Sequence, residues 1–95
     1  MINVGGEKVF PAEVESVIQE LENVAEVTVY SEMNPILGNI VCAKIRLSTP
    51  ENQKDFKLRM KLYCKEKLQP FKIPVKVLFE EGKLYNDRYK KNRVI

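Results

Sequence analysis

The sequence contains no histidine, only two cysteines, and no apolar run long enough to cross a membrane. Cys42 and Cys64 are too few and too far apart along the chain to suggest a metal site. Two isolated thiols are typical of buried residues in a reducing compartment, so we expect a cytoplasmic protein with no bound metal. The chain also lacks the basic-then-apolar opening segment of a secreted precursor.

The length sets a second limit. A chain of 95 residues forms one domain, with room for a modest core but not for a deep, enclosed substrate pocket as well. With 44% hydrophobic and 31% charged residues, the composition is that of a globular domain and not of a disordered segment.

The charge is distributed unevenly along the chain. Residues 1–52 carry three Lys or Arg and eight Asp or Glu, whereas residues 53–95 carry thirteen and five. The two halves therefore have net charges of −5 and +8. Such a split is typical of a basic half that faces nucleic acid, an anionic cofactor or an acidic partner. The alternative is that two solvated surfaces neutralise each other across the fold.

The hydrophobic periodicity predicts a helix, two strands, a second helix and a third strand, in that order. Together they predict an α+β fold, in which an antiparallel three-stranded sheet packs against two helices and a basic C-terminal tail follows. We see no internal repeat and no second domain. The expected elements are, in the same order, residues 11–23, 25–30, 41–47, 48–68 and 75–79.

Both helices have recognisable starts. Pro11 suits the first position of a helix, and Glu13 and Glu15 suit the positive first turn. The second helix is expected to be capped by Ser48 or Thr49. The side chains expected on its inner face are Phe56, Leu58, Met60, Leu62, Tyr63 and Cys64.

The rest of the chain is organised around residues 5–15, which read Gly-Gly-Glu-Lys-Val-Phe-Pro-Ala-Glu-Val-Glu. Glycine adopts positive φ without strain and lets a ligand approach the backbone closely. A short apolar pair, Val9 and Phe10, separates Gly5 and Gly6 from the helix start. This order predicts a loop, a brief strand and a helix, with the loop held in place by the strand and helix after it.

Residues 2–15 resemble the glycine-loop motif that opens the C-terminal domain of adenylate-forming enzymes, which include the acyl-CoA synthetases. Residues 24–29, 38–47 and 68–74 resemble later segments of that domain, in the same order. The resemblance covers nearly the whole chain, and its first motif is the most specific. The Gly-Gly-Glu form of the loop looks more like that of the coenzyme A ligases.

The resemblance implies a mobile lid on a larger enzyme. The chain begins in mid-motif, and the expected partner is an N-terminal adenylation domain that binds ATP, with Mg²⁺, and a carboxylic acid. The lid first supplies a lysine for acyl-adenylate formation. It then rotates, and Gly5 and Gly6 line the channel for the pantetheine thiol of coenzyme A or of a carrier protein.

Two lysines are candidates for the adenylation residue, and the resemblance favours Lys90. The family lysine normally follows a glycine, which this sequence offers only at Gly82, before Lys83. Counted from the aromatic end of the last strand, however, it lies eleven positions on, at Lys90. Arg93 then occupies the place of the family arginine, and Tyr89 replaces the glycine.

Other charged residues are weaker candidates. The resemblance places Lys72 near the phosphates of coenzyme A, and Lys76 is a lesser candidate for the same role. Glu13 and Glu15 are better explained as helix-start charges than as an acid–base pair.

Two alternatives belong to other functional classes. A small α+β domain with a basic second half could bind RNA, although aromatic and basic residues do not alternate on any single strand as base stacking requires. The chain could also be a stand-alone regulatory module that has lost its partner domain. On the favoured interpretation the isolated chain has no turnover of its own.

Overall fold

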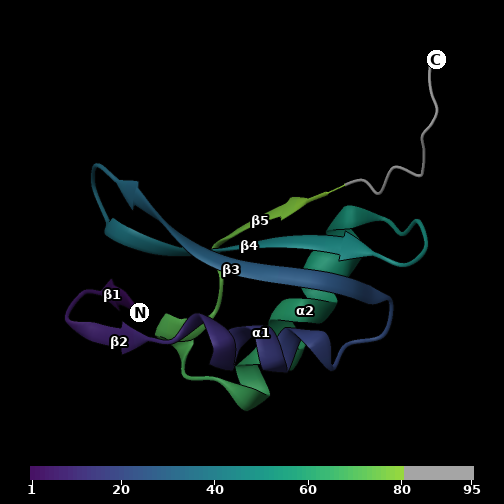
Figure 1. The fold of residues 1–95 in the computed structure, drawn as a ribbon, viewed down its shortest axis with the longest axis horizontal. Coiled ribbons are helices and arrows are strands. Elements are labelled where there is room, and N and C mark those ends of the chain that lie inside the picture. The colour runs from purple at the N-terminus through teal and green to yellow at the C-terminus, as the bar shows by residue number, and fades with distance from the viewer. Residues whose placement is uncertain (81–95) are drawn as a thin grey trace.

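The computed structural model describes residues 1–80. Two short strands, β1 (Ile2–Val4) and β2 (Glu7–Val9), precede helix α1 (Pro11–Gln19). Strands β3 (Val24–Asn34) and β4 (Gly38–Leu47) follow, then helix α2 (Gln53–Lys67), a 3-10 turn η1 (Pro70–Lys72) and strand β5 (Lys76–Phe79) (Figure 1). The α+β prediction is confirmed. The basic tail, with Lys83 and Lys90, lies outside the described residues.

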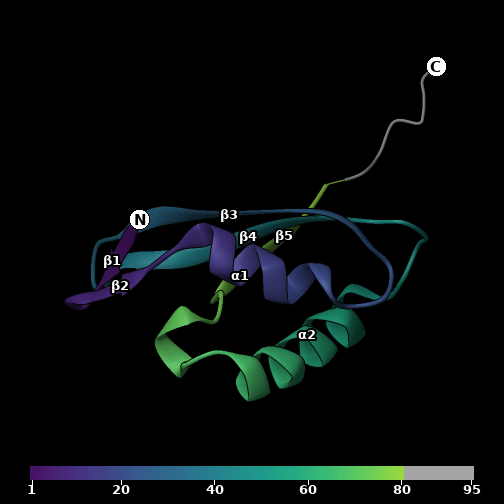
Figure 2. The same cartoon turned by 60° about the horizontal axis from the view of Figure 1, so that its bottom comes forward.

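The strands form two sheets. β1 and β2 make a two-stranded ribbon, and β3, β4 and β5 make a three-stranded sheet in that order. Both helices lie on the same side of the larger sheet, with α1 along β3 (Figure 2) and Phe56 of α2 against Phe79 of β5. The small ribbon lies at the end of the domain where the β3–β4 hairpin turns.

β3 and β4 are longer than the sequence predicts. They pair in antiparallel fashion from Val24–Leu47 to Asn34–Gly38. The apolar alternation stops near residue 30, but backbone pairing continues to the turn. There the Asn34 side chain accepts hydrogen bonds from the amides of Ile36 and Leu37, both at 2.9 Å. Local hydrogen bonding at the turn, and not side-chain burial, therefore extends this hairpin.

The prediction of an all-antiparallel sheet was wrong for the third strand. β5 pairs with β4 in parallel, with Ala43 opposite Val77 and Ile45 opposite Phe79. The reason lies in the connection, because α2 carries the chain back to the end of the sheet where β4 began. Parallel neighbours need such a crossover, whereas a short turn can only join antiparallel strands.

The start of α2 also differs from prediction. Asn52 is the cap, since its side chain accepts the amide of Asp55 at 3.0 Å. Ser48 and Thr49 are instead held against Asn23, whose carbonyl and side-chain oxygens accept their backbone amides at 2.8 and 2.7 Å. Asn23 itself has a positive φ of 75°, which this residue tolerates. Residues 48 and 49 are thus fixed to the turn before β3 and cannot open the helix.

The core lies between the helices and the sheet. From α2, Phe56, Met60 and Cys64 are fully buried, one every fourth residue. The Phe56 ring meets that of Phe79 edge to face, with centroids 5.7 Å apart. The other buried side chains of the helices and of the larger sheet are Val14, Ile18, Val24, Val29, Val41, Cys42, Ala43, Ile45 and Val77.

Two predicted core residues of α2 lie on its outer face. Leu58 is 61% exposed and Leu62 is 56% exposed. With 3.6 residues per turn, they fall opposite the buried row of Phe56, Met60 and Cys64. Neither helix in the described part of the chain is long and apolar enough to span a bilayer.

Met60→Ala should lower the free energy of unfolding by about 2–5 kcal/mol, because it leaves a cavity in the core. Leu62→Ala, on the exposed face of the same helix, should change it by no more than about 0.5 kcal/mol. Urea unfolding followed by circular dichroism measures both. Equal losses for the two variants would contradict the assignment of the two faces.

Candidate functional site

The glycine loop is the turn of the β1–β2 ribbon. Gly5 and Gly6 join strands whose register pairs Val4 with Glu7, so the connection has only two residues. Their φ angles are +56° and +89°. A two-residue hairpin of this kind needs positive φ at both central positions, which explains two glycines in succession. The Asn3 side chain accepts the Gly6 amide at 2.9 Å and closes the turn.

The space beside this turn is open. A Cβ atom placed on Gly5 or Gly6 would meet no other atom within 4 Å, and both residues are exposed. Within residues 1–80 the two glycines therefore serve the backbone conformation and do not relieve crowding. The exposed backbone of the turn leaves room for a thin ligand chain to pass along it.

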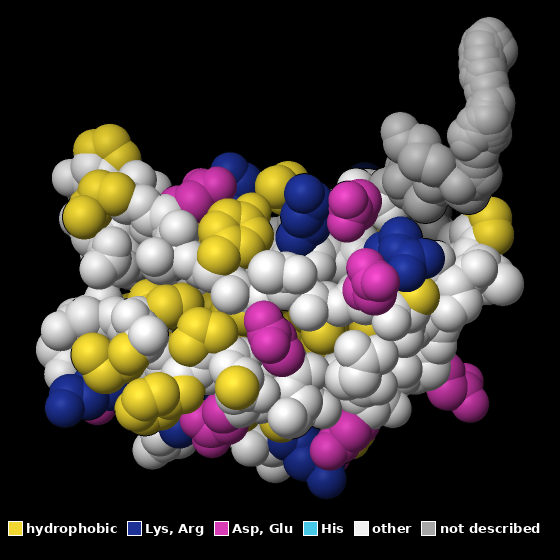
Figure 3. All heavy atoms as spheres, in the orientation of Figure 1, with side chains coloured by type: hydrophobic (Ala, Val, Ile, Leu, Met, Phe, Trp, Pro, Cys, Tyr) yellow, Lys and Arg dark blue, Asp and Glu magenta, His cyan; other side chains and the backbone are white. Residues whose placement is uncertain are grey.

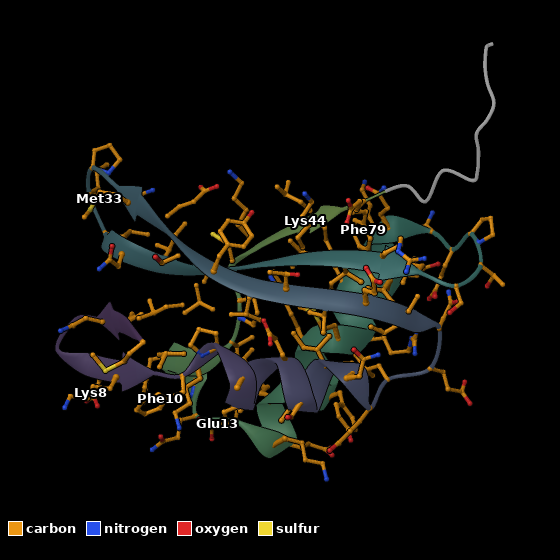
Figure 4. The ribbon with its side chains drawn as sticks, viewed as in Figure 1. Lys8, Phe10, Glu13, Met33, Lys44 and Phe79 are labelled. Carbon is orange, nitrogen blue, oxygen red and sulfur yellow. The ribbon has the colours of Figure 1, made fainter. Side chains whose placement is uncertain are left out.

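The base of the ribbon is anchored in the protein. Ile2 and Val9 face each other across the two strands and are only 5% and 0% exposed. β1 contacts β4, and β2 contacts η1. Phe10, by contrast, is 54% exposed at the point where the ribbon leads into α1 (Figure 4). The turn is therefore presented on a rigid support.

Lys72 lies close to this support and is paired with Glu13. Its Nζ is 3.0 and 3.3 Å from the two carboxylate oxygens, and its side chain is only 16% exposed. The pair joins η1 to the first turn of α1, directly after the ribbon. Lys76 is paired in the same way with Glu32 on β3, at 3.0 Å. The predicted role of Lys72 at coenzyme A stays a prediction.

Glu15 has a structural partner that sequence reasoning missed. Its Oε2 accepts the backbone amide of Val29 at 2.8 Å, which fastens α1 along β3. Since β3 is an edge of the larger sheet, the carboxylate satisfies a backbone donor that β4 does not reach. Glu13 and Glu15 have separate partners here, as expected of residues that do not form an acid–base pair.

The thiols match the sequence prediction. Cys42 and Cys64 are free and buried. Burial raises the pKa of Cys64 to about 11 and also raises the pKa of Cys42. Because the thiolate is the reactive form, neither residue is a nucleophile at neutral pH. In the part of the chain that the structure describes, no three His, Cys, Asp or Glu side chains come together as a metal site.

The two halves of the chain neutralise each other at several points. Besides Lys72 with Glu13 and Lys76 with Glu32, Arg59 of α2 pairs with Glu51 at 3.0 Å. A hydrogen bond from Asn23, as the larger cause, and the pairing with Arg59 lower the pKa of Glu51. Basic and acidic side chains are interspersed over the face shown in Figure 3. The alternative of mutually neutralising surfaces therefore explains part of the charge split.

The predicted adenylation lysine lies outside residues 1–80. Lys90, and Lys83 with it, lie beyond Glu80, the last described residue. Glu80 donates its backbone amide to the carbonyl of Ile45 at 2.8 Å, which continues the pairing of β5 with β4 to that point.

Comparison with known proteins gives consistent results. Residues 13–88 match the family described as the AMP-binding enzyme C-terminal domain. Over 82 residues the chain is 37% identical to the mitochondrial medium-chain acyl-CoA ligase of Rattus norvegicus, covering 86% of this chain and 13% of the relative. It is also 38% identical, over 74 residues, to the 3,4-dihydroxybenzoate–[aryl-carrier protein] ligase of Bacillus anthracis, covering 78% of this chain and 16% of the relative.

The fold is shared with solved structures of the same kind. One is the o-succinylbenzoate CoA synthetase of Bacillus subtilis in complex with its acyl-adenylate intermediate, with a TM-score of 0.70 and 34% identity. The match covers 83% of this chain and 16% of that one. This chain thus spans a small part of the proteins it resembles. It belongs to the family of AMP-binding enzyme C-terminal domains.

Proposed function

We propose that this chain is the C-terminal domain of an AMP-forming acid–thiol ligase of the acyl-CoA ligase type. The observation that carries the proposal is the family match over residues 13–88, together with two relatives that are named as ligases and of which this chain covers only 13% and 16%. The rest of such an enzyme is an N-terminal adenylation domain in the same protein. ATP with Mg²⁺ and the acid bind there, and this chain alone has no turnover.

In the first half-reaction the domain contributes a lysine, which we assign to Lys90. An ammonium group with an ordinary pKa of ~10.4 is charged at neutral pH and acts as a compact point donor. Placed where negative charge develops on the carboxylate and phosphate oxygens, it lowers the barrier to adenylate formation. Lys83 is the second candidate for this role.

In the second half-reaction the glycine turn lines the path of the pantetheine thiol. The exposure of the turn and the open space where Cβ atoms would stand support this role. Its rigid base keeps the backbone fixed while a narrow chain passes along it. The acceptor is coenzyme A, in keeping with the acyl-CoA ligase relative, and a carrier-protein arm is the alternative suggested by the aryl-carrier protein ligase. A cytoplasmic location stays a prediction.

RNA binding is the less favoured alternative. Three of the basic side chains in the second half are paired with carboxylates of the first half. The outer face of the larger sheet presents Tyr30 as its only aromatic side chain among residues 1–80, and stacking platforms need more than one.

Lys90→Ala in the intact parent protein should reduce ATP–pyrophosphate exchange by about a hundredfold to a thousandfold, because the developing charge loses its donor. Thioester formation from added acyl-adenylate should be unchanged. Lys83→Ala is the matched control and should leave both half-reactions intact. Normal exchange by the Lys90 variant would contradict the assignment.

Gly5→Asn should impair thioester formation and spare adenylation, the reverse of the result expected for Lys90→Ala. Asparagine tolerates positive φ and is common in this turn type, so the variant should fold. Its side chain enters the open space beside the turn and should slow thioester formation at least about tenfold, or ~1.4 kcal/mol in barrier. ATP–pyrophosphate exchange should be unaffected.

Gly38→Asn supplies the control for that experiment, because Gly38 also has positive φ (+80°) and no atom within 4 Å of its Cβ position, but lies in the other hairpin. It should leave thioester formation unchanged. If Gly5→Asn forms thioester as fast as the unmodified protein, the glycine turn does not line the thiol path.

Lys72 and Glu13 should affect coenzyme A binding in opposite directions if Lys72 contacts a coenzyme A phosphate. Lys72→Ala should then raise the KM for coenzyme A about tenfold, or ~1.4 kcal/mol. Glu13→Gln should lower that KM, since it removes the carboxylate that competes with phosphate for the ammonium. The KM for ATP is the internal control. An unchanged KM for coenzyme A in both variants would show that the pair is purely structural.

A further inference from the structure

The outer face of α2 carries an apolar groove that the core does not use. Leu58 and Leu62 of α2 line one side. Pro70, Ile73, Pro74 and Val75, which follow α2 in the chain, line the other. The groove has a volume of about 470 Å³. Leu58, Leu62 and Val75 are 61%, 56% and 62% exposed, so three large apolar side chains face solvent around one hollow.

The groove is lined by other residues than the glycine turn, although its wall at η1 contacts β2 of the ribbon. α2 packs against the larger sheet through Phe56 and Phe79, whereas the β1–β2 ribbon lies at one end of the domain (Figure 2). η1 and the residues between it and β5 supply the second wall, where Pro70 and Pro74 restrict the backbone. The groove is therefore a fixed concave surface and not a gap in a flexible loop.

The two flanks of the leucine pair carry charges of opposite sign. Lys61 and Lys65 line it directly, and Lys54 falls on the same flank of α2 at 3.6 residues per turn. The other flank of the leucine pair carries Asp55 and Glu66. Among residues 1–80, no ion pair includes any of these three lysines, unlike Arg59, Lys72 and Lys76.

We propose that this groove, which we call the α2 groove, docks an acidic amphipathic helix of a separate protein. Helices bind such grooves through large apolar side chains repeated every three or four residues. A row of carboxylates along one edge of that helix would meet Lys54, Lys61 and Lys65. Charge complementarity of this kind fixes orientation and excludes unsuitable partners.

Other occupants fit the charges less well. The last segment of this chain, residues 81–95, is basic overall and would be repelled by the same lysines. A second copy docked through the same face would bring its own lysines to the contact, since a two-fold interface uses one patch twice. An anionic bilayer would meet Asp55 and Glu66 as well as the lysines, and a bilayer surface does not fill a concave groove.

The choice of a separate protein rests on the proposed function. That function uses the glycine turn and the C-terminal tail to meet the adenylation domain, and the α2 groove belongs to neither. The chemistry of the groove itself does not depend on that function. A binding assay on the chain is therefore independent of any assay of ligase activity.

The test uses a synthetic helical peptide of about 20 residues, with leucines every three or four positions and glutamates along one flank. Its affinity for the 95-residue chain, and for the intact parent protein, is measured by fluorescence anisotropy. The double variant Leu58→Ser/Leu62→Ser should weaken binding at least about tenfold. Leu78→Ser is the matched control, because Leu78 is 43% exposed on the opposite face of the sheet, and it should leave the affinity within about twofold.

Charge reversal gives a second test. Lys61→Glu/Lys65→Glu should weaken binding of the acidic peptide about tenfold and should allow binding of a matched peptide with lysine in place of glutamate. Thermal unfolding of each variant checks that the fold is kept.

Four results would overturn the proposal. These are no binding of the acidic peptide, equal binding by the leucine variant, binding to phosphatidylserine vesicles in place of the peptide, and a concentration-dependent dimer that the leucine substitutions abolish. Normal ligase activity alongside any of them would leave the proposed function intact.

Discussion

The position of the glycine turn depends on the burial of Ile2 and Val9. These two residues face each other at the base of the β1–β2 ribbon and are almost completely removed from solvent. A two-stranded ribbon is at best marginally stable by itself, so its conformation must come from this anchor. Full burial of an aliphatic side chain contributes about 1.5–3 kcal/mol, which is enough to hold two short strands in register.

The anchor links the turn to the rest of the domain. Val9 is followed at once by Phe10 and Pro11, and the helix that begins there is fixed by Glu15 to β3 and by Glu13 to Lys72. The turn, α1, η1 and the larger sheet therefore move together. A domain that presents different surfaces to a partner in successive steps needs this property, since rotation of a rigid body moves every surface at once.

The charges of the domain fall into two groups. Lysines that join elements, such as Lys72 and Lys76, have carboxylate partners from the acidic half of the chain. Lysines on the outer face of α2 lie beside exposed leucines and belong to no ion pair within the described residues. The first group stabilises the fold, and the second leaves a surface whose chemistry is unused by the fold.

Much of the fold could be predicted from sequence, because long elements carry clear periodicity. Residues 25–30 and 41–47 alternate as half-buried strands, and both main helices were correctly identified. The short strands β1 and β2 do not show alternation, although the two glycines marked their turn. The direction of β5 depends on the path of the crossover, which periodicity does not encode. Ser48 and Thr49 do not cap α2 because Asn23, which lies far away in sequence, binds their backbone amides, and no local pattern shows this contact.

The site was only partly predictable for similar reasons. The turn at Gly5 and Gly6 was found because a positive-φ turn has a compositional signature, while the role of these glycines at the thiol path stays a prediction. The partners of Glu13 and Glu15 were not, since ion pairs and hydrogen bonds between distant elements leave no local pattern. Leu58 and Leu62 were wrongly placed in the core, because exposed apolar residues look like core residues when only composition is considered.

The central claim is that one rigid domain presents two surfaces in turn to an adenylation domain. The most direct measurement is the distance between a spin label on this domain and one on the adenylation domain of the intact parent protein. Ser16→Cys is a suitable position, because Ser16 is exposed on α1 and both cysteines of this domain, Cys42 and Cys64, are buried. The account predicts one interdomain distance with ATP and acid and a different interdomain distance after coenzyme A is added. The distance between labels at positions 16 and 44, both within this domain, should stay unchanged. A single interdomain distance under all conditions would contradict it.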